Sequence, residues 1–316
     1  MYSLRNKSCI LMHQKPLFET SVGATVLLSD FSFVPKCKPA EEEDVLQLRR
    51  FLNTQKNISV LTGAGISTES GIPDYRSTGV GLYARSTRRP VLYKEFRESE
   101  STRRRYWARN YVGWPRFSTI KPNVSHGLLK SLEDEGRLNC IITQNVDNLH
   151  TKAGSKSVIE LHGTAFRVMC LSCDHKICRF ELQEIFNKLN PNMNVTSRMI
   201  RPDGDVELTQ EQVEEFIVPP CENCGGIIKP DIIFFGDNVP RQIVDSVKYN
   251  VEHSDSLLIL GSTLTTYSGY RIALQARDAR KPIVVVNIGE TRADSLASIK
   301  VEGRCGDILS RALNDS

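Results

Sequence analysis

The sequence predicts an α/β fold in which a doubly wound parallel sheet is covered by helices on both faces. Three observations in the 316-residue chain lead to this prediction. Short runs rich in β-branched residues alternate with helical patterns along most of the chain. Several of these runs are apolar without alternation, as is typical of parallel strands buried on both sides. A glycine-rich turn follows the first run directly.

The expected elements can be assigned in chain order. Residues 41–56 read as a helix, because their apolar positions recur on one face. Strands are predicted at 58–61, 140–143, 158–161, 257–260 and 283–286. Helices are predicted between them at 123–137, 241–253 and 267–281. This order is Rossmann-like, so ligands are expected at the carboxyl ends of the strands.

Four cysteines interrupt the alternation as two Cys-x-x-Cys pairs, Cys170 with Cys173 and Cys221 with Cys224. Two such turns can present four thiolates to one tetrahedral Zn²⁺, and this leaves no ligand position for water. We therefore expect one structural zinc ion. A disulfide, a redox dithiol and Cys178 in place of one ligand are the alternatives.

These cysteines also suggest the domain division. A smaller zinc-binding module with a long polar loop is predicted over 166–225, inserted into a Rossmann-like domain formed by 41–165 and 226–316. Within the module, 180–189 reads as an amphipathic helix and 191–218 as the loop. Loops of this length in compact domains are uncommon and are usually functional or disordered.

Composition and charge exclude several classes of protein. Hydrophobic residues make up 40% of the chain and charged residues 25%, as in ordinary globular domains. No apolar stretch approaches the roughly 20 residues that span a bilayer, so we expect no membrane insertion. The net charge is +4, of which residues 1–40 carry +3 (five basic against two acidic residues). The remaining +1 is not that of a nucleic-acid-binding protein.

Residues 1–40 have the composition of a mitochondrial presequence followed by a disordered tail. They are basic and rich in hydroxyl groups, and they hold no acidic residue before Glu19. The expected location is therefore the mitochondrial matrix. A disordered tail without a targeting role is the alternative, and a secretory signal is disfavoured because the apolar stretch 9–12 is short.

The glycine-rich turn Gly63-Ala64-Gly65 predicts a dinucleotide site. A strand that ends in Gly-x-Gly lets backbone N–H groups approach a phosphate, and a following helix N-terminus adds partial positive charge. The usual dehydrogenase pattern is incomplete, because Gly71 follows Gly65 by six residues instead of three. The acidic ribose ligand expected about twenty residues later is also missing.

Four later segments accompany this turn in a fixed order: 143–150 (TQNVDNLH), 160–163 (ELHG), 261–263 (GST) and 284–287 (VVVN). Together with the glycine turn and the cysteine pairs, they resemble the sirtuins, the NAD-dependent protein deacylases, over about residues 45–310. Segments 63–76, 81–85, 106–110 and 234–237 are most similar to the class II mitochondrial branch of sirtuin four. The resemblance implies that NAD is a co-substrate.

His162 is the candidate general base. It follows the strand predicted at 158–161, which places its imidazole at the carboxyl edge of the sheet. A neutral imidazole can take a proton from a ribose hydroxyl. By resemblance, His162 is the sirtuin base, while Asn145 and Asp147 line the nicotinamide and ribose pocket. We interpret the other conspicuous histidines, His126, His150 and His253, as structural.

The resemblance implies NAD contacts in three parts of the chain. The first part holds phosphates and the carboxamide and comprises Gly63, Ala64, Gly65, Ile66, Ser67, Thr68, Glu69, Ile72, Pro73, Asp74, Tyr75, Arg76 and Tyr83. The second comprises Gln144, Asn145, Val146 and Asp147. The third, for a phosphate and the adenosine, comprises Gly261, Ser262, Thr263, Asn287, Ile288, Gly289 and Cys305. Tyr75 departs from the phenylalanine common in the family but keeps an aromatic ring.

The substrate and the reaction are also implied by the resemblance. The substrate backbone would pair by strand addition with Ile232, Ile233, Phe234, Phe235 and Gly236, for which a plain core strand is the alternative. The acyl oxygen would attack C1′ of the ribose as nicotinamide leaves, and His162 would then activate the 2′-hydroxyl. The products would be free lysine, nicotinamide and O-acyl-ADP-ribose. Expected partners are acylated or ADP-ribosylated mitochondrial proteins, without nucleic acid or membrane.

The sequence indicates the preferred acyl group less directly than it indicates the cofactor. Resemblance to the sirtuin-four branch implies longer or branched groups, of glutaryl and lipoyl type, over acetyl. Sirtuins that read acidic acyl groups carry a tyrosine and an arginine three residues apart just beyond the cofactor loop, whereas Tyr83 and Arg85 are two apart. Tyr106 and Arg109 have the spacing, in a predicted helix. We expect the 191–218 loop near the acyl-lysine channel, a solvated excursion being the alternative.

Two other functions remain possible from the residues alone. A mono-ADP-ribosyltransferase would use the same expulsion of nicotinamide. An NAD-responsive regulatory binding module with feeble catalysis would recognise partners through the zinc module, but retention of His162, Asn145 and Asp147 argues against it.

Overall fold

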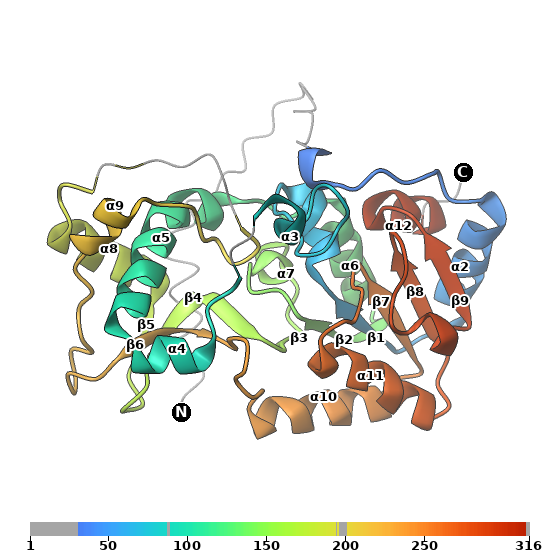
Figure 1. The fold of residues 1–316 in the computed structure, drawn as a ribbon. Helices are drawn as coiled ribbons and strands as arrows, with labels where there is room; N and C mark the ends of the chain where they lie inside the picture. The colour runs from blue at the N-terminus through green and yellow to red at the C-terminus, as the bar shows by residue number, and fades with distance from the viewer. Residues whose placement is uncertain (1–30, 87–88, 194, 196–200, 314–316) are drawn as a thin grey trace, which may run out of the picture.

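The structure is a computed structural model, and it describes residues 31–86, 89–193, 195 and 201–313. Most of the predicted presequence lies outside this part of the chain. In Figure 1 the large sheet and its helices form the right-hand part of the molecule, and the smaller module forms the left-hand part. No helix in the described ranges is long and apolar enough to cross a membrane.

The large sheet has six parallel strands in the order β3-β2-β1-β7-β8-β9. Their bounds are β1 Ile58–Thr62, β2 Leu138–Thr143, β3 Val158–Glu160, β7 Ser256–Leu260, β8 Ile283–Asn287 and β9 Ile299–Glu302. The first three strands run outward in one direction from β1, and the last three run outward in the other direction from β7. The strand order therefore reverses between β1 and β7, and this switch point is where a doubly wound sheet binds its ligand.

Helices cover both faces of this sheet, which confirms the predicted doubly wound fold. The first face packs on α2 (Glu42–Thr54), α6 (Val124–Asp134) and α12 (Cys305–Leu313), and the second on α10 (Arg241–His253) and α11 (Tyr267–Asp278). Neighbouring residues of one strand serve opposite faces, since Val60 packs in the first core and Leu61 in the second. Both layers are apolar, so the strands show no alternation in sequence.

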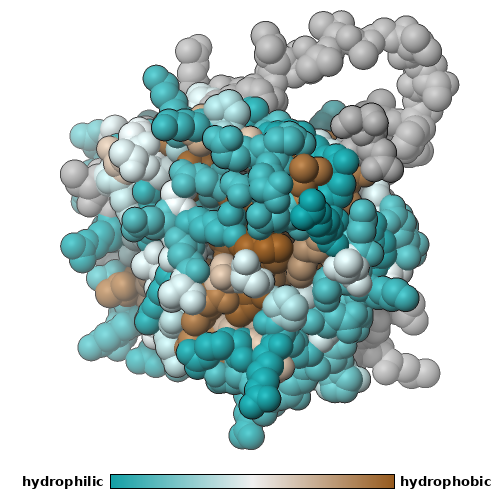
Figure 2. Space-filling view, turned by 90° about the vertical axis from the view of Figure 1, so that its right-hand side faces the viewer, coloured by the Kyte–Doolittle hydropathy of each residue, from teal (hydrophilic) through white to brown (hydrophobic). Residues whose placement is uncertain are grey.

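Strand β9 was missed by the sequence prediction. It lies at the edge of the sheet and reads Ile-Lys-Val-Glu, so it lacks the continuous apolar character of the central strands. Charged side chains of this kind protect an edge strand from pairing with another chain. Figure 2, which views the molecule from the side where β9 lies in Figure 1, shows a mostly hydrophilic surface with an apolar area near its centre.

The smaller sheet is antiparallel, with strand order β5-β4-β6. Its strands are β4 (Gly163–Cys170), β5 (Lys176–Cys178) and β6 (Ile228–Ile232). The sheet thus extends beyond the predicted limits of 166–225 at both ends. The physical reason is the antiparallel pairing of β4 with β6, which joins Cys170 to Ile228 and Gly163 to Ile232.

Four helices share one hydrophobic core with the smaller sheet: α4 (Tyr93–Glu98), α5 (Glu100–Thr119), α8 (Arg179–Leu189) and α9 (Gln210–Glu214). The longest, α5, is tied to β6 by the indole of Trp107, which donates to the Ile228 carbonyl at 3.3 Å. The remaining short helices are η1 (Phe31–Phe33), η2 (Ala64–Ser70), α3 (Leu82–Arg85), α7 (Leu149–Lys152) and η3 (Asp294–Leu296). The smaller module therefore includes a segment before β2 that its cysteines did not indicate.

The two Cys-x-x-Cys turns meet at one end of the smaller sheet. The four Sγ atoms of Cys170, Cys173, Cys221 and Cys224 lie within 4.8 Å of one another. Two of the separations are 3.5 and 3.8 Å, close to the roughly 3.8 Å that a tetrahedral site with Zn–S bonds of about 2.3 Å requires. Cys178 does not belong to this group, so the four expected thiolates fit a structural zinc ion.

We predict that Cys170→Ser combined with Cys221→Ser removes the zinc and destabilises the protein, because each Cys-x-x-Cys turn loses a ligand. Metal analysis should fall from about one zinc per chain to none. The melting temperature should fall by roughly 2–4 °C for each kcal/mol lost. Cys37→Ser, outside the cluster, is the control. Unchanged zinc content and melting temperature in the double variant would show that the thiolates hold no metal.

Candidate active site

A cavity of about 680 Å³ opens at the carboxyl ends of the large sheet and extends to the smaller module. Its lining residues follow β1, β2, β7 and β8 on one side and come from β6 and α5 on the other. The cavity therefore includes the switch point of the sheet, where a nucleotide is expected in this fold.

Two glycine loops touch each other at the switch point: the first, Gly63-Ala64-Gly65, follows β1, and the second, which begins at Gly261, follows β7. The Gly63 N–H donates to the Leu260 carbonyl at 3.0 Å, and the Gly65 N–H donates to the Gly261 carbonyl at 2.8 Å. A Cβ atom on Gly65 would lie 2.8 Å from the Gly261 oxygen, so only glycine permits this approach. Both loops line the cavity, and such bare backbone is suited to a pyrophosphate.

The helix that follows the first loop differs from the expected one. It is the short 3₁₀ helix η2, and it ends at Gly71, whose φ of +85° lies in the left-handed region. Gly71 therefore caps this helix and does not act as a displaced third glycine of the dehydrogenase pattern.

Asn145 and Asp147 are fixed against the first loop by hydrogen bonds. The Ser67 hydroxyl donates to Asp147 at 2.7 Å, and the Leu149 N–H donates to the other carboxylate oxygen at 2.9 Å. The Asn145 amide donates to the Gly63 carbonyl and to Ser67 at 3.0 and 3.1 Å. Burial raises the pKa of Asp147, and the hydrogen bonds from Leu149 and Ser67 oppose this rise.

His162 is oriented so that one ring nitrogen is held by the backbone. Its Nδ1 lies 3.0 Å from the Gln144 carbonyl, and since a carbonyl only accepts, Nδ1 carries the hydrogen. In the neutral ring Nε2 is then the acceptor, and it receives the hydroxyl of Ser268 at 2.8 Å. Burial lowers the pKa of His162, which favours this neutral form, although the bond to Gln144 opposes the shift. Both His162 and Ser268 line the cavity.

Asp74 and Gln144 anchor further parts of the lining. The Asp74 carboxylate accepts from the N–H groups of Arg76 and Ser77 at 2.9 and 2.8 Å, which closes a tight turn. The Gln144 amide donates to Ser262 at 2.8 Å and so links the loop after β2 to the loop after β7. A Cβ on Gly269 would lie 2.6 Å from the Gln144 side chain, so this link is closely packed.

Most of the residues proposed from sequence line this cavity. They are Gly63, Ala64, Gly65, Ser67, Thr68, Glu69, Ile72, Asp74, Tyr75, Arg76, Gln144, Asn145, Val146, Asp147, His162, Ile232, Ile233, Phe234, Phe235, Gly236, Gly261, Ser262, Thr263, Asn287, Ile288 and Cys305. Four proposed cofactor residues lie outside the lining: Ile66, Pro73, Tyr83 and Gly289. Ile66 is buried in the first core, and the Tyr83 ring packs 5.9 Å from that of Tyr75. The buried His126 and His150 also lie outside it.

The segment proposed for the substrate backbone is an edge that is partly occupied. Ile232 ends β6 at the edge of the smaller sheet, and the Ile233 N–H donates to the His162 carbonyl at 2.9 Å. Beyond it, Phe235 forms a parallel bridge with Leu92, and the Tyr93 N–H donates to the Phe235 carbonyl at 2.9 Å. The segment thus connects the cavity to α4.

Known proteins share this architecture and sequence. The model of the Sir2 family matches residues 63–268. The chain belongs to the Sir2 family. It is 54% identical over 279 residues to "NAD-dependent protein deacylase Sirt4" of Drosophila melanogaster, covering 88% of this chain and 89% of that protein. It is 52% identical over 277 residues to the human "NAD-dependent protein lipoamidase sirtuin-4, mitochondrial", covering 88% of each.

Solved structures of the family superimpose on this Sir2-family chain. One, described as "Sir2-p53 peptide-NAD+", matches with a TM-score of 0.67 and 30% identity over 86% of this chain and 97% of that one. Another, "Structure of Sir2Tm bound to a propionylated peptide", matches with a TM-score of 0.65 and 31% identity over 84% and 96%.

Several cavity residues of this Sir2-family protein were not proposed from sequence. Among them are Tyr106, Arg109, Arg201, Pro202, Asp203, Asp205 and Ser268. The spacing of Tyr106 and Arg109 was the one available signal, because positions three apart on a helix share a face. Arg201, Pro202, Asp203 and Asp205 show that part of the 191–218 loop lies in the cavity wall.

We predict that Gly65→Ala weakens the binding of ADP-ribose at least about tenfold, equivalent to about 1.4 kcal/mol. The added methyl group would lie 2.8 Å from the Gly261 oxygen and would force the two loops apart. Isothermal titration calorimetry measures the change. Gly127→Ala is a matched control, since its Cβ would meet no atom within 4 Å on helix α6. Wild-type affinity in Gly65→Ala would refute the role of the loop contact.

Proposed function

We propose that this protein is an NAD-dependent protein-lysine deacylase that releases nicotinamide and O-acyl-ADP-ribose. The observation that carries the proposal is the orientation of His162, whose acceptor nitrogen faces the cavity that also contains the glycine loops, Asn145 and Asp147. The relatives are named as an NAD-dependent protein deacylase and an NAD-dependent protein lipoamidase. Those names favour deacylation over mono-ADP-ribosyl transfer as the main activity.

The residues of the cavity fit NAD as a co-substrate. The close-packed loops at Gly65 and Gly261 would hold its phosphates, and Asn287, which lies at the carboxyl end of β8, would bind the adenosine ribose. When bound, NAD supplies an activated ribose and nicotinamide as its leaving group. Asn145 and Asp147 would then orient the ribose from the loop after β2.

The proposed task of His162 is to accept a proton from a ribose hydroxyl. The Gln144 carbonyl keeps the hydrogen on Nδ1, so Nε2 is the basic atom. The Ser268 hydroxyl now bonded to Nε2 would exchange places with the ribose hydroxyl. Burial keeps the imidazole neutral and ready to accept, because it lowers the pKa of the ring.

For the acyl group, we propose a preference for longer or branched chains, of glutaryl or lipoyl type, over acetyl. The cavity extends past His162 to Tyr106 and to the segment after Arg201, which gives room beyond a two-carbon group. The human and bovine relatives are named lipoamidases. Mass spectrometry of NAD-dependent products from a panel of acyl-lysine peptides tests both proposals, because O-acyl-ADP-ribose and ADP-ribosylated protein differ in mass.

We predict that His162→Tyr lowers deacylation by about 10²- to 10⁴-fold, because the general base is lost. Binding of ADP-ribose should persist, since the glycine loops and Asn287 are unchanged, and calorimetry measures it. His253→Tyr is the control, because the His253 side chain is exposed at the end of α10 and its ring bonds the Tyr249 carbonyl of the same helix. Near-wild-type formation of O-acyl-ADP-ribose by His162→Tyr would refute the proposed chemistry.

We further propose that the protein works on acylated proteins of the mitochondrial matrix. The support is the basic opening of the chain and the word "mitochondrial" in the names of the human and bovine relatives. Residues 1–30 fused to a fluorescent protein should direct it to the matrix, because a basic opening with few acidic residues is typical of presequences. A fusion in which Arg5, Lys7 and Lys15 are changed to Gln is the control. Diffuse fluorescence from the unaltered fusion would contradict the proposal.

A further inference from the structure

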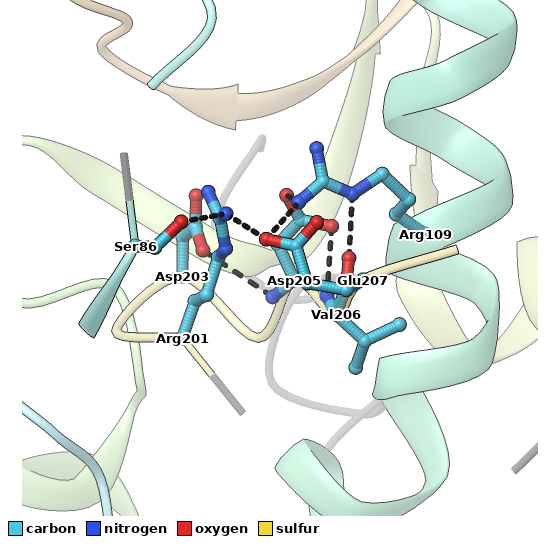
Figure 3. A network of polar contacts seen from close by, with 7 residues as sticks. All are labelled: Ser86, Arg109, Arg201, Asp203, Asp205, Val206 and Glu207. Carbon is cyan, nitrogen blue, oxygen red and sulfur yellow. Dashed lines mark hydrogen bonds and ion pairs between the residues drawn. The ribbon is translucent and has the colours of Figure 1, made fainter. Parts of the chain in front are cut away.

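Two buried arginines line the cavity on the side of the smaller module, and carboxylates of the chain itself bind both. Arg109 projects from α5, and Arg201 begins the segment 201–207, which we name the acidic strap; their exposed fractions are 5% and 3%. Figure 3 shows the carboxylates of Asp205 and Glu207 between the two guanidinium groups.

The contacts within this group are direct. Arg109 Nη2 lies 3.2 Å from Asp205 Oδ2 and 3.3 Å from Glu207 Oε1, and its Nε donates to the Val206 carbonyl. Arg201 Nη2 contacts the same oxygen of Glu207 and donates to the Ser86 hydroxyl at 3.1 Å. Among the described residues, Arg201 Nε has no hydrogen-bond partner, so one donor beside the cavity remains unused.

Backbone packing fixes the acidic strap against α5. The Gly204 N–H donates to the Arg201 carbonyl at 2.9 Å, and the Arg201 N–H donates to the Asp205 carbonyl at 3.0 Å, which closes a turn. A Cβ on Gly113 of α5 would lie 2.0 Å from the Gly204 oxygen. The absence of a side chain at Gly113 therefore lets the strap lie against the helix beside Arg109.

This arrangement bears on which ligands the cavity accepts. A guanidinium in a dry wall is the strongest protein group for a ligand carboxylate, because it offers charge and paired donors. Here Asp205 already occupies that position on Arg109. Burial raises the pKa of Asp205 to about 7, Arg109 lowers it, and Asp203 adds to the rise. Burial therefore opposes the charged form of Asp205, and the 3.2 Å pair with Arg109 favours it.

We propose that Asp205, assisted by Glu207, selects among acyl groups by competing with a terminal carboxylate of the acyl chain for Arg109. The inference rests on the proposed deacylase function. An acyl chain with a neutral end meets a wall whose charges are already paired. A chain that ends in a carboxylate must displace Asp205 to reach Arg109, so it binds more weakly than a neutral chain of the same length. Asp205 is thus the residue that determines specificity for acidic against neutral acyl groups.

The test compares glutaryl-lysine and pentanoyl-lysine peptides, whose five-carbon chains differ only in a terminal carboxylate or methyl group. Calorimetry on the full chain without NAD gives the ratio of their dissociation constants. Asp205→Asn retains an oxygen for the Val206 N–H, which now bonds Asp205 at 2.8 Å, but removes the charge. We expect the ratio to shift toward glutaryl at least about tenfold, or 1.4 kcal/mol.

Matched variants define the cause. Asp205→Asn combined with Arg109→Gln should return the ratio to its wild-type value, because the competing pair is then gone. Glu211→Gln removes the same charge from the exposed helix α9 and should leave the ratio unchanged. Glu207→Gln, with a side chain about 31% exposed, should shift the ratio in the same direction as Asp205→Asn. If Asp205→Asn does not fold, the ratio measured for Glu207→Gln tests the proposal.

An unchanged ratio in the folded Asp205→Asn or Glu207→Gln variants would overturn the inference, as would an equal shift in Glu211→Gln. Because the measurement is of binding, it is separate from the proposed reaction. A shifted ratio in a protein that forms no O-acyl-ADP-ribose would refute the deacylase function and retain the role of Asp205.

Discussion

The contact between the two glycine loops is the constraint on which the rest of the site depends. Strands β1 and β7 are neighbours although they are far apart in sequence, so the loops that follow them leave the sheet side by side. The Gly65 N–H bond to Gly261 holds them in backbone contact. Any side chain there would separate them. The position of the cavity at the switch point follows from this strand order together with these two glycines.

Successive hydrogen bonds that start at those loops then position the polar groups of the cavity. Ser67, which follows Gly65 by two residues, holds both Asn145 and Asp147. The loop after β2 carries these residues and also Gln144, whose side chain binds Ser262 and whose carbonyl fixes His162. These polar groups are thus bonded to neighbours that line the same cavity. Such a network is already arranged before a ligand arrives, which is what a catalytic site requires.

The sequence allowed most of the large sheet and the glycine loops that line the cavity to be predicted, for a physical reason. Central strands such as β7 are apolar throughout, and glycines such as Gly65 mark close backbone approaches, so both leave local signals. Strand β9 left none, because an edge strand need not be apolar. The pairing of Arg109 with Asp205 left none either, since these residues are 96 positions apart and meet only through tertiary packing. Charged residues in sequence are usually solvated, and only the fold shows these as buried.

Helix α5 connects the stability of the smaller module to the chemistry of the cavity. Tyr106, Arg109 and Gly113, spaced three and four apart, form the face toward the cavity and the acidic strap. Trp107 and Trp114 lie one position further along and enclose the buried guanidinium of Arg179, at 5.8 and 4.6 Å from their ring centres.

The Arg179 Nε donates to the side chain of Asn110 on α5 at 2.9 Å. Helix α8, which begins at Arg179, packs with β4 and β6 in one core. The cysteine cluster fixes the ends of those strands, because Cys170 closes β4 and Cys221 lies shortly before β6. A disturbance at the cysteines would therefore pass through Arg179 to α5 and change where Arg109 stands. None of the four clustered cysteines lines the cavity, yet the position of Arg109 in its wall depends on them.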